Sequence, residues 1–315
     1  MLISLDECDG LFRCPRSGKP LTRETGGLGL TDGDGNRYDT VDGVPVLVDF
    51  ESSLLTPEIT RRLSAPIKRS GREGLMQRIR TFFSSSHVRS ASNAQRLVEM
   101  LHAGAASGSE RPRVLVVGGG TVGHGMARLH HDADIALIAF DIYASPYVQF
   151  VADAHRIPLM SERFDAVVVQ AVLEHVLEPA TVVREIHRVL RPDGIVYAET
   201  PFMQQVHEGA YDFTRFTESG HRYLFRDFER LDSGVLAGVG TQLLWSLEYF
   251  ARGLLRSRRA GKVLKYALIW LQLLDRLVPE AYNVDGASGV YFLGRRAARP
   301  MEPRDLITHY QGCDH

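Results

Sequence analysis

A glycine-rich turn followed by a well-placed acid gives this chain residues that could hold a nucleoside. The turn comes directly after the apolar run Val114–Val117, and its glycines are Gly118, Gly119, Gly120 and Gly123. Residues without a Cβ allow a tight turn and let backbone N–H groups approach a ligand. Asp141 follows the apolar run Ile135–Phe140, about 20 residues after the glycines, which is the offset of an acid that accepts hydrogen bonds from ribose hydroxyls. An ordinary strand-to-helix turn is the alternative for the glycines taken alone.

A second set of polar residues lies between Glu199 and Phe225 and could bind a substrate or take a proton from it. Histidine exchanges its proton near neutral pH, so His207 is the first candidate for a general base, followed by His175 and His221. The candidates for substrate binding are Glu208, Tyr211, Asp212 and Arg215. Two structural alternatives stay open. Asp212 and Arg215 would form an ion pair that ties down a loop, and His175 would start a helix.

The apolar runs before these polar residues predict the fold. Val114–Val117 shows no alternation of apolar and polar residues, which is typical of a parallel strand buried on both faces. The glycine turn, Asp141, a further acid at Asp153 and two more apolar runs then follow in the order that a doubly wound sheet requires. Such sheets bind ligands at the carboxyl ends of their strands. The sequence therefore predicts an α/β fold with its site at that edge.

Residues 111–235 closely resemble the S-adenosylmethionine-dependent methyltransferases of the seven-stranded, Rossmann-like class, type 11 among them. The similarity rests on the segments VVGGGTVG, FDIY, ADAHRIP, RFDAVVVQAVLEHV and PATVVREIHRVLRPDGIVYAETP. It implies a mostly parallel Rossmann-like sheet flanked by helices, with S-adenosylmethionine as the cofactor. The chain departs from the family at Val116, two residues before the first glycine, where an acid is usual.

The resemblance also implies which residues contact the cofactor. They are Gly118, Gly119, Gly120, Gly123, Asp141, Ile142, Asp153, Ala154 and Gln170. Asp153 is expected to bond to the adenine amino group, and the loop that carries His207 is expected on the acceptor side. Because the sulfonium is already an activated methyl donor, the protein must chiefly align the acceptor with the methyl group and keep the site dry.

Residues 1–50 are predicted to form a small β-rich module without a metal ion. They resemble the zinc-ribbon-like domain that accompanies some methyltransferases, and Tyr38 and Val44–Val48 are expected to pack its core. Of the four cysteine positions of that domain only Cys14 is kept, and the others hold Ser17, Thr31 and Asp34. One cysteine cannot make a structural zinc site. No acidic cluster is evident at the acceptor side, so we expect no metal ion anywhere in the chain.

The rest of the chain divides into a connector, residues 51–110, and a methyltransferase domain, residues 111–315. Helical spacing at Ala91–Leu101 predicts a helix beside the sheet, and a lid over the cofactor that includes His87 and Asn93 is the sharper hypothesis. A helical insertion is expected at about 241–279, before a last strand at Gly289–Arg296. Within residues 245–275 the insertion combines basic and aromatic residues, as helices on anionic membranes do. Packing on the domain or in a homodimer is the commoner explanation.

Composition excludes several classes of protein. The chain has 315 residues, 44% of them hydrophobic, which is enough for one large domain and one small one. A formal net charge of −1 gives no signal for nucleic-acid binding. Three scattered cysteines do not make a disulfide framework, and we expect neither a signal peptide nor a transmembrane helix. These features predict a cytoplasmic protein, with peripheral contact to the inner face of the membrane as an alternative.

These observations lead to two classes of function. The first is an enzyme that methylates an oxygen of a sugar, a glycan or another small hydroxyl-bearing acceptor, with RNA and protein as alternative acceptors. The second is a non-catalytic partner or scaffold, which the missing acid at Val116 and the lost cysteines would explain. Retention of Asp141, Asp153 and the glycines argues for the enzyme. A dehydrogenase fits the LEHV and RPDG segments less well than a methyltransferase does.

Overall fold

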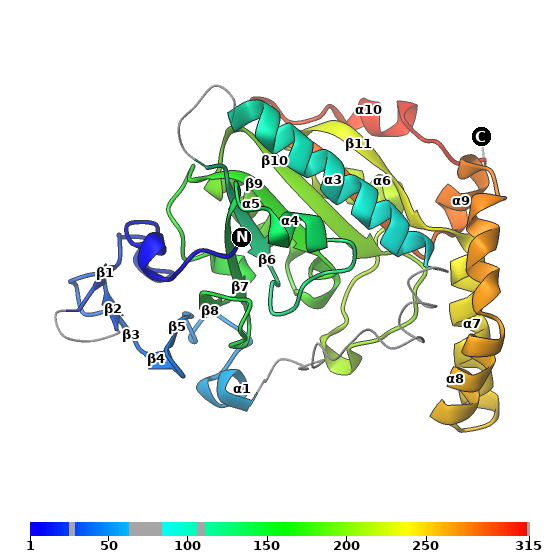
Figure 1. The fold of residues 1–315 in the computed structure, drawn as a ribbon, viewed down its shortest axis with the longest axis horizontal. Helices are drawn as coiled ribbons and strands as arrows, with labels where there is room; N and C mark the ends of the chain where they lie inside the picture. The colour runs from blue at the N-terminus through cyan, green and yellow to red at the C-terminus, as the bar shows by residue number, and fades with distance from the viewer. Residues whose placement is uncertain (25–28, 63–83, 106–110, 314–315) are drawn as a thin grey trace.

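A nine-stranded sheet lies at the centre of the computed structural model, which describes residues 1–24, 29–62, 84–105 and 111–313 (Figure 1). Across the described residues its strand order is β11-β12-β10-β9-β6-β7-β8-β5-β4. The strand bounds are β4 (Thr40–Val41), β5 (Val44–Leu47), β6 (Arg113–Val117), β7 (Ala136–Asp141), β8 (Phe150–Ala152), β9 (Phe164–Gln170), β10 (Leu190–Pro201), β11 (Phe228–Ala237) and β12 (Gly289–Arg296). Strands β10 to β5 are parallel, and β12 is antiparallel to both of its neighbours. The predicted α/β fold with a large, mostly parallel sheet is confirmed, and β12 has the predicted bounds.

Helices cover both faces of this sheet. The helices of the domain body are α1 (Pro57–Arg62), α3 (Ser85–Ala105), α4 (Ala127–His131), α5 (Pro179–Val189), α6 (Glu218–Leu224), α9 (Glu280–Gly286) and α10 (Pro303–Thr308). Helix α3 crosses the face that is nearer the viewer in Figure 1. The predicted helix Ala91–Leu101 forms the second part of α3. The predicted connector lies partly outside the described residues, at 63–83 and 106–110.

Alternate residues of β6 explain why both faces of the sheet are buried. Val114 and Val116 pack in one cluster with residues of α3, among them Leu97 and Leu101. Leu115 and Val117 pack in the cluster on the opposite face, which contains the apolar residues of α5. Side chains of a strand point alternately to its two faces, so an unbroken apolar run is needed where helices cover both.

The first fifty residues extend the sheet at its β8 edge. Strand β5 pairs in parallel with β8, through Val46 opposite Val151, and the β1 (Thr22–Arg23), β2 (Leu30–Thr31) and β3 (Arg37–Tyr38) strands form a small separate sheet. Leu2 bridges to Leu137 of β7, so the start of the chain also lies along the sheet. Tyr38 is buried, as predicted, and it shares one hydrophobic core with Phe140 and Phe150 of the large sheet. Because this segment pairs with the edge, it covers backbone groups that would otherwise be exposed.

The predicted helical insertion forms a pair of helices at one end of the sheet. Helix α7 (Val239–Leu254) is followed by α8 (Arg258–Ala267) and by the 3₁₀ segment η5 (Ile269–Arg276), so the turn at 255–257 lies close to the predicted one (Figure 1). Asp275 of η5 accepts hydrogen bonds from the backbone of Gly240 and Thr241, at 2.7 and 3.0 Å. A carboxylate at a helix N-terminus satisfies unpaired N–H groups and complements the helix dipole. Within the described residues, none of the helices is long and apolar enough to cross a membrane.

Candidate functional site

The glycine turn lies at the carboxyl end of β6, where side chains would have no room. Gly118 has a φ of +74°, and a Cβ added there would lie 2.3 Å from Val172 Cγ2. A Cβ at Gly120 would lie 2.7 Å from Asp141 Oδ2, and one at Gly123 would lie 1.7 Å from Gln170 Oε1. Only glycine permits this close packing of backbone against side chains. The turn therefore offers the backbone cradle that a nucleoside cofactor needs.

Asp141, the last residue of β7, faces this turn. Its carboxylate accepts hydrogen bonds from the backbone N–H of Gly120 at 2.8 Å and of Ile142 at 2.7 Å. Burial raises the pKa of Asp141 to about 6, although both hydrogen bonds oppose the shift. Ile142 is 39% exposed and so offers an apolar surface beside the carboxylate. The carboxylate can accept hydrogen bonds from ribose hydroxyls, and Ile142 can pack against the base. Together they fit the nucleoside half of S-adenosylmethionine.

The second predicted acid, Asp153, lies after β8 and already has partners. It accepts hydrogen bonds from the Ser53 hydroxyl and from the backbone N–H of His155. It also accepts one from the His155 ring, whose Nδ1 lies 2.6 Å from Asp153 Oδ1. Burial would raise the pKa of Asp153, but these hydrogen bonds outweigh it and lower the pKa. A carboxylate has about four acceptor positions, so one of them is left for a ligand. Ala154 is buried beside it.

A buried polar network that the sequence analysis missed joins the cofactor side to α3. Gln170 donates to the backbone oxygen of His124 at 3.0 Å and to Glu199 Oε2 at 2.6 Å. Tyr197 donates to Glu199, and Asn93 of α3 donates to the Tyr197 hydroxyl at 3.1 Å. Glu199 is only 4% exposed, and this burial raises the pKa of its carboxyl group. The available signal was a glutamate inside the apolar run of β10. Asn93, proposed above for a lid, is buried in this network.

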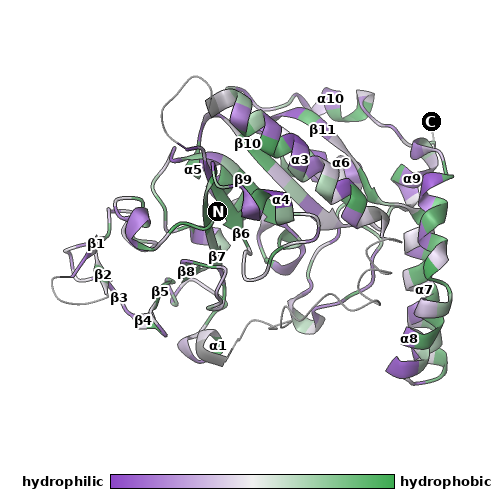
Figure 2. Ribbon diagram, in the orientation of Figure 1, coloured by the Kyte–Doolittle hydropathy of each residue, from purple (hydrophilic) through white to green (hydrophobic). Residues whose placement is uncertain are grey.

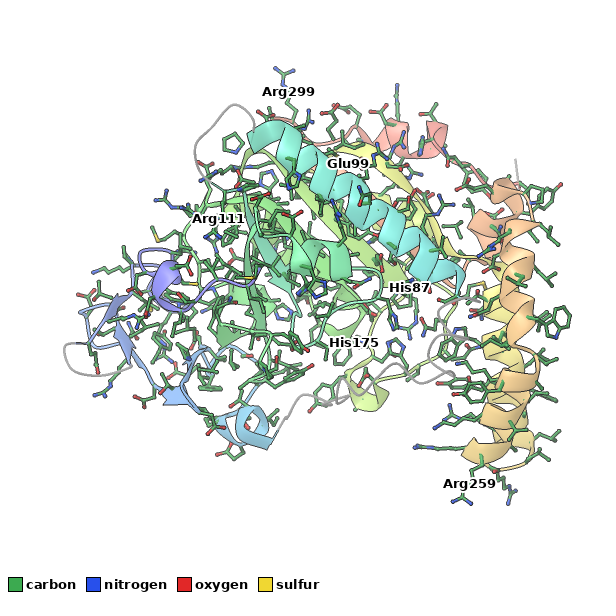
Figure 3. The ribbon with its side chains drawn as sticks, viewed as in Figure 1. His87, Glu99, Arg111, His175, Arg259 and Arg299 are labelled. Carbon is green, nitrogen blue, oxygen red and sulfur yellow. The ribbon has the colours of Figure 1, made fainter. Side chains whose placement is uncertain are left out.

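Glu174, His175 and His207 come together on the expected acceptor side. Glu174 and His175 end the 3₁₀ turn η3 (Leu173–His175) after β9, and His207 lies in the loop after the neighbouring β10. Glu174 Oε1 lies 3.6 Å from His175 Nε2 and 3.9 Å from His207 Nε2. The two imidazole rings meet edge to face with 5.0 Å between centroids. Figure 3 labels His175 at this edge of the sheet. Burial raises the pKa of Glu174 to about 7 and lowers that of His175.

Asp212 and Arg215 form the predicted ion pair, and the pair organises the loop. Arg215 Nε donates to the backbone oxygen of Gln204 at 2.9 Å, and Asp212 Oδ2 accepts from the backbone N–H of His207 at 2.8 Å. Hydrogen bonds from Arg215 hold the pKa of Asp212 well below its usual range. Glu208 and Tyr211 are exposed on the same loop. This arrangement fits the structural alternative for the pair better than direct substrate binding.

His221 lies in the hydrophobic core and not at the acceptor side, which removes it from the candidate bases. The residue is 1% exposed, and its ring packs between Phe216, Phe225 and Phe292. Burial lowers the pKa of His221 to about 3. The helical spacing of α6 turns this side chain inward, which the mixed polar and aromatic sequence of the segment did not reveal.

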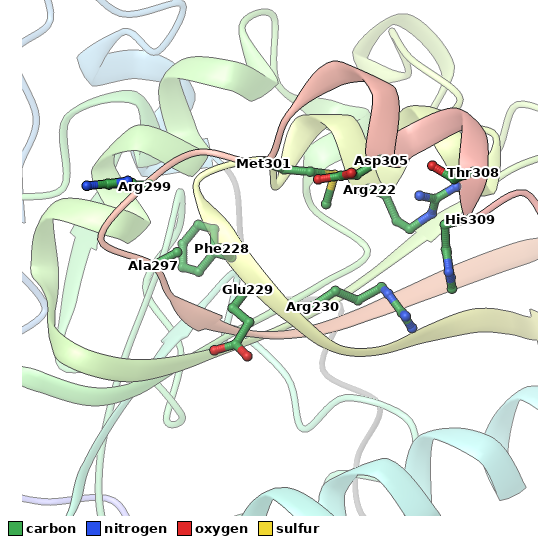
Figure 4. A pocket seen from close by; sticks show the side chains of 10 residues that line it. All are labelled: Arg222, Phe228, Glu229, Arg230, Ala297, Arg299, Met301, Asp305, Thr308 and His309. Carbon is green, nitrogen blue, oxygen red and sulfur yellow. The ribbon is translucent and has the colours of Figure 1, made fainter.

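A cavity of about 500 Å³ lies elsewhere, between α6, β11 and α10 (Figure 4). It is lined by Arg222, Phe228, Glu229, Arg230, Ala297, Arg299, Met301, Asp305, Thr308 and His309. None of these residues belongs to the predicted site, and the cavity has neither a glycine turn nor a strand-end acid. The cavity therefore lies apart from the predicted site at the carboxyl ends of β6, β7, β9 and β10.

One part of the chain matches a known protein family. Residues 117–198 match the family model described as a methyltransferase domain. The match runs from the end of β6 into β10, and it includes the glycine turn, Asp141, Asp153 and Glu174. This part of the chain is therefore similar to a methyltransferase domain, and the match supports S-adenosylmethionine as the cofactor. No curated protein sequence matches the chain.

Solved structures resemble the chain at low sequence identity. A Galdieria sulphuraria protein, provisionally assigned as a sarcosine dimethylglycine methyltransferase, is 15% identical over 67% of this chain and 86% of its own, with a TM-score of 0.43. Haemonchus contortus phosphoethanolamine N-methyltransferase 2 with S-adenosyl-L-methionine is 14% identical over 65% of this chain and 52% of its own, with a TM-score of 0.42. The [4+2]-cyclase SpnF is 20% identical over 65% and 81%, with a TM-score of 0.40.

Proposed function

We propose that this protein is an S-adenosylmethionine-dependent methyltransferase that methylates an oxygen of a small hydroxyl-bearing acceptor, such as a sugar or glycan. The observation that carries the proposal is that two chemically different groups share one edge of the sheet. The glycine turn and Asp141 form a nucleoside cradle, and the cluster of Glu174, His175 and His207 offers acceptors for a proton. Methylation of RNA or protein, and a role as a non-catalytic partner, are the alternatives.

Tyr143 supports the idea that these two groups serve one reaction. A Cβ at Gly120 would lie 2.4 Å from Tyr143 Cε2, so this ring packs on the glycine turn. Burial raises the pKa of Tyr143 to about 12, and the charges of Asp141 and Glu208 add to the shift. Glu208 of the acceptor loop therefore acts electrostatically on a residue of the cofactor cradle. The cofactor cradle and the acceptor loop therefore lie within electrostatic range of each other, as one shared reaction would require.

Different residues would hold the cofactor, orient the acceptor and take its proton. S-adenosylmethionine supplies an activated methyl group when it is bound. The glycine turn and Asp141 would hold its nucleoside, while the loop fixed by Arg215 would orient the acceptor in line with the methyl group. An oxygen acceptor loses its proton as it attacks. In the absence of a metal ion, the Nε2 atoms of His175 and His207 and the Glu174 carboxylate would be the groups to take it.

Replacing Asp141 with alanine should weaken cofactor binding and leave the fold intact. The change removes a charged group that would accept hydrogen bonds from the ribose hydroxyls. We therefore expect the affinity for S-adenosylmethionine to be about 10- to 100-fold lower. Titration calorimetry with S-adenosylmethionine and S-adenosylhomocysteine measures this directly. Asp134→Ala, at an exposed acid, is the matched control and should bind like the unchanged protein. The absence of binding to the unchanged protein at millimolar ligand would overturn the enzyme proposal in favour of the non-catalytic one.

We further propose that the tip of the α7–α8 pair contacts an anionic membrane surface. Helix α7 leaves an apolar stripe exposed at helical spacing, with Leu243 47%, Phe250 66% and Leu254 68% exposed. Figure 2 shows hydrophobic residues along this helix. Basic residues surround the tip, and those exposed are Arg256, Arg258, Arg259 and Lys262. Figure 3 labels Arg259 at the end of the pair. Apolar residues flanked by cations are what binding to an anionic lipid surface requires.

Exposed leucines at this tip should control vesicle binding. We expect the protein to sediment with phosphatidylserine vesicles but not with phosphatidylcholine vesicles, and the double variant Leu254→Asp, Leu255→Asp to lose about 10-fold or more in affinity. The matched control is Leu277→Asp, a change at a residue that is 78% exposed away from the tip. If the unchanged protein does not bind vesicles but dimerises through the same leucines in analytical ultracentrifugation, the surface is a homodimer contact.

A further inference from the structure

We infer that Glu174, His175 and His207 bind a divalent transition-metal ion of the zinc type. The carboxylate and imidazole atoms of these three residues all lie within 4.8 Å of one another. In a tetrahedral zinc site with bonds of about 2.0–2.1 Å, two ligand atoms are separated by roughly 3.4 Å. The separations of 3.6 and 3.9 Å from Glu174 Oε1 to the two Nε2 atoms would therefore need to shrink only slightly. This inference departs from the metal-free chain that the sequence predicted.

Glu174 is the observation that points to a ligand. The residue is fully buried, and neither of its carboxylate oxygens has a hydrogen-bond partner among the described residues. A buried carboxylate without a hydrogen bond is costly, and natural proteins pair such groups or use them to coordinate metals. The two Nε2 atoms nearest to it are too far away for hydrogen bonds. A cation bound between the three residues would neutralise the Glu174 carboxylate and fill the space between its oxygen and the two Nε2 atoms.

The hydrogen bonds of both histidines direct their free nitrogens toward Glu174. His175 Nδ1 lies 2.7 Å from the backbone oxygen of Tyr211, which can only accept, so Nδ1 carries the proton. His207 Nδ1 lies 3.3 Å from the backbone oxygen of Gln205 and 3.4 Å from Asp212 Oδ2, so the same reasoning applies. In neutral imidazoles the lone pairs are then on Nε2, which faces Glu174. Metal-binding histidines are usually oriented by such outer hydrogen bonds to a carbonyl or carboxylate.

The two imidazoles and one carboxylate indicate which ion would bind and how that ion could act on the acceptor. Two imidazoles and one carboxylate suit zinc and related first-row ions, whereas magnesium and calcium prefer oxygen ligands. Three protein ligands leave a fourth position open, as in catalytic zinc sites. With an ion bound, the Nε2 atoms would no longer be free to take a proton. An acceptor hydroxyl in the open position would instead become more acidic, as zinc-bound water does, and would lose its proton to solvent. This last step rests on the proposed function, whereas the metal site itself does not.

The chain offers a natural control in a second group of residues that could hold a cation. Among the described residues, His102, Asp132 and Asp134 also bring three ligand atoms within 4.8 Å. In this group Asp134 is exposed and the other two residues are only partly buried. None of its side-chain oxygens or nitrogens is both buried and unpaired in the described structure. It therefore lacks the feature that distinguishes Glu174.

Metal titration of the chelator-treated protein tests the inference without any activity assay. We expect one Zn²⁺ per chain by calorimetry, and visible absorption of bound Co²⁺ typical of a site with imidazole ligands. His175→Ala and His207→Ala should each weaken Zn²⁺ binding about 100-fold or more, since even losing an outer partner of a ligand costs 10- to 100-fold. Glu174→Gln, a change of nearly the same shape, should weaken it similarly without unfolding the protein. His102→Ala should have no effect.

Two results would overturn the inference. One is no stoichiometric Zn²⁺ binding by the folded protein. The other is binding that persists in all three variants of the site but is lost in His102→Ala, which would assign the ion to the exposed group. Calorimetry with S-adenosylmethionine on the same samples keeps the proposals apart. A protein that binds zinc through His175 and His207 but does not bind S-adenosylmethionine supports the metal site and contradicts the proposed function.

Discussion

Arg222→Met is expected to lower the free energy of unfolding by about 3–5 kcal/mol. Arg222 is 1% exposed, and its Nε donates to both oxygens of Glu218 at 2.8 and 2.9 Å. Its Nη2 donates to the backbone oxygen of Leu306 at 3.2 Å, so the guanidinium also holds α10. Methionine fills much of the same volume but leaves the Glu218 carboxylate buried without a counter-charge. Urea unfolding followed by circular dichroism measures the loss.

A double variant separates the charge from the packing at this site. Replacing both partners of a buried ion pair with apolar residues of similar volume is often neutral or stabilising. Glu218→Leu with Arg222→Met should therefore recover most of the stability that Arg222→Met loses, although Ser233 loses its 2.8 Å hydrogen bond to Glu218. A loss below about 1 kcal/mol in the single variant would show that Glu218 is not held as a buried charge.

Acid should destabilise the protein through His221 below pH 6.5, the ordinary pKa of histidine. Burial lowers the pKa of His221 to about 3, so between these values the unfolded chain binds a proton that the folded chain does not. Stability from this group is complete above pH 6.5 and is lost as the pH falls toward 3. At about 1.4 kcal/mol per pH unit, the loss by pH 3 is on the order of 5 kcal/mol. Unfolding measured at a series of pH values reports it.

His221→Leu should flatten this pH dependence and also stabilise the protein at neutral pH. Leucine does not titrate, and neither ring nitrogen of His221 has a hydrogen-bond partner among the described residues, so replacing the ring removes a cost of about 1–3 kcal/mol. His131→Leu is the matched control, because His131 is exposed. Its charge adds to the burial that lowers the pKa of His130 to about 4, so its replacement should change the pH profile only slightly. An unaltered acid slope in His221→Leu would mean that the ring is protonated inside the fold or that other groups dominate.

The sequence by itself determined the central strands, the glycine turn after β6 and the position of Asp141. The run Val114–Val117, the glycines after it and Asp141 at the end of the next run are short-range patterns, since each depends on neighbours within one strand and one turn. A strand buried on both faces needs an unbroken apolar run, and a backbone cradle needs glycine, so residue types alone predict both. For the same reason the position of β12 was predicted to the residue.

Only the tertiary structure decided how distant residues meet. Glu174 and His207 lie more than thirty positions apart in the chain, and no local pattern shows that adjacent parallel strands bring them to one edge. The sequence therefore showed no acidic cluster and predicted no metal. His221 looked like a member of the polar loop, but α6 buries it among aromatic rings. The first fifty residues looked like a separate module, yet β5 pairs with β8. Pairing and burial depend on partners far along the chain, so they follow from packing and not from local residue types.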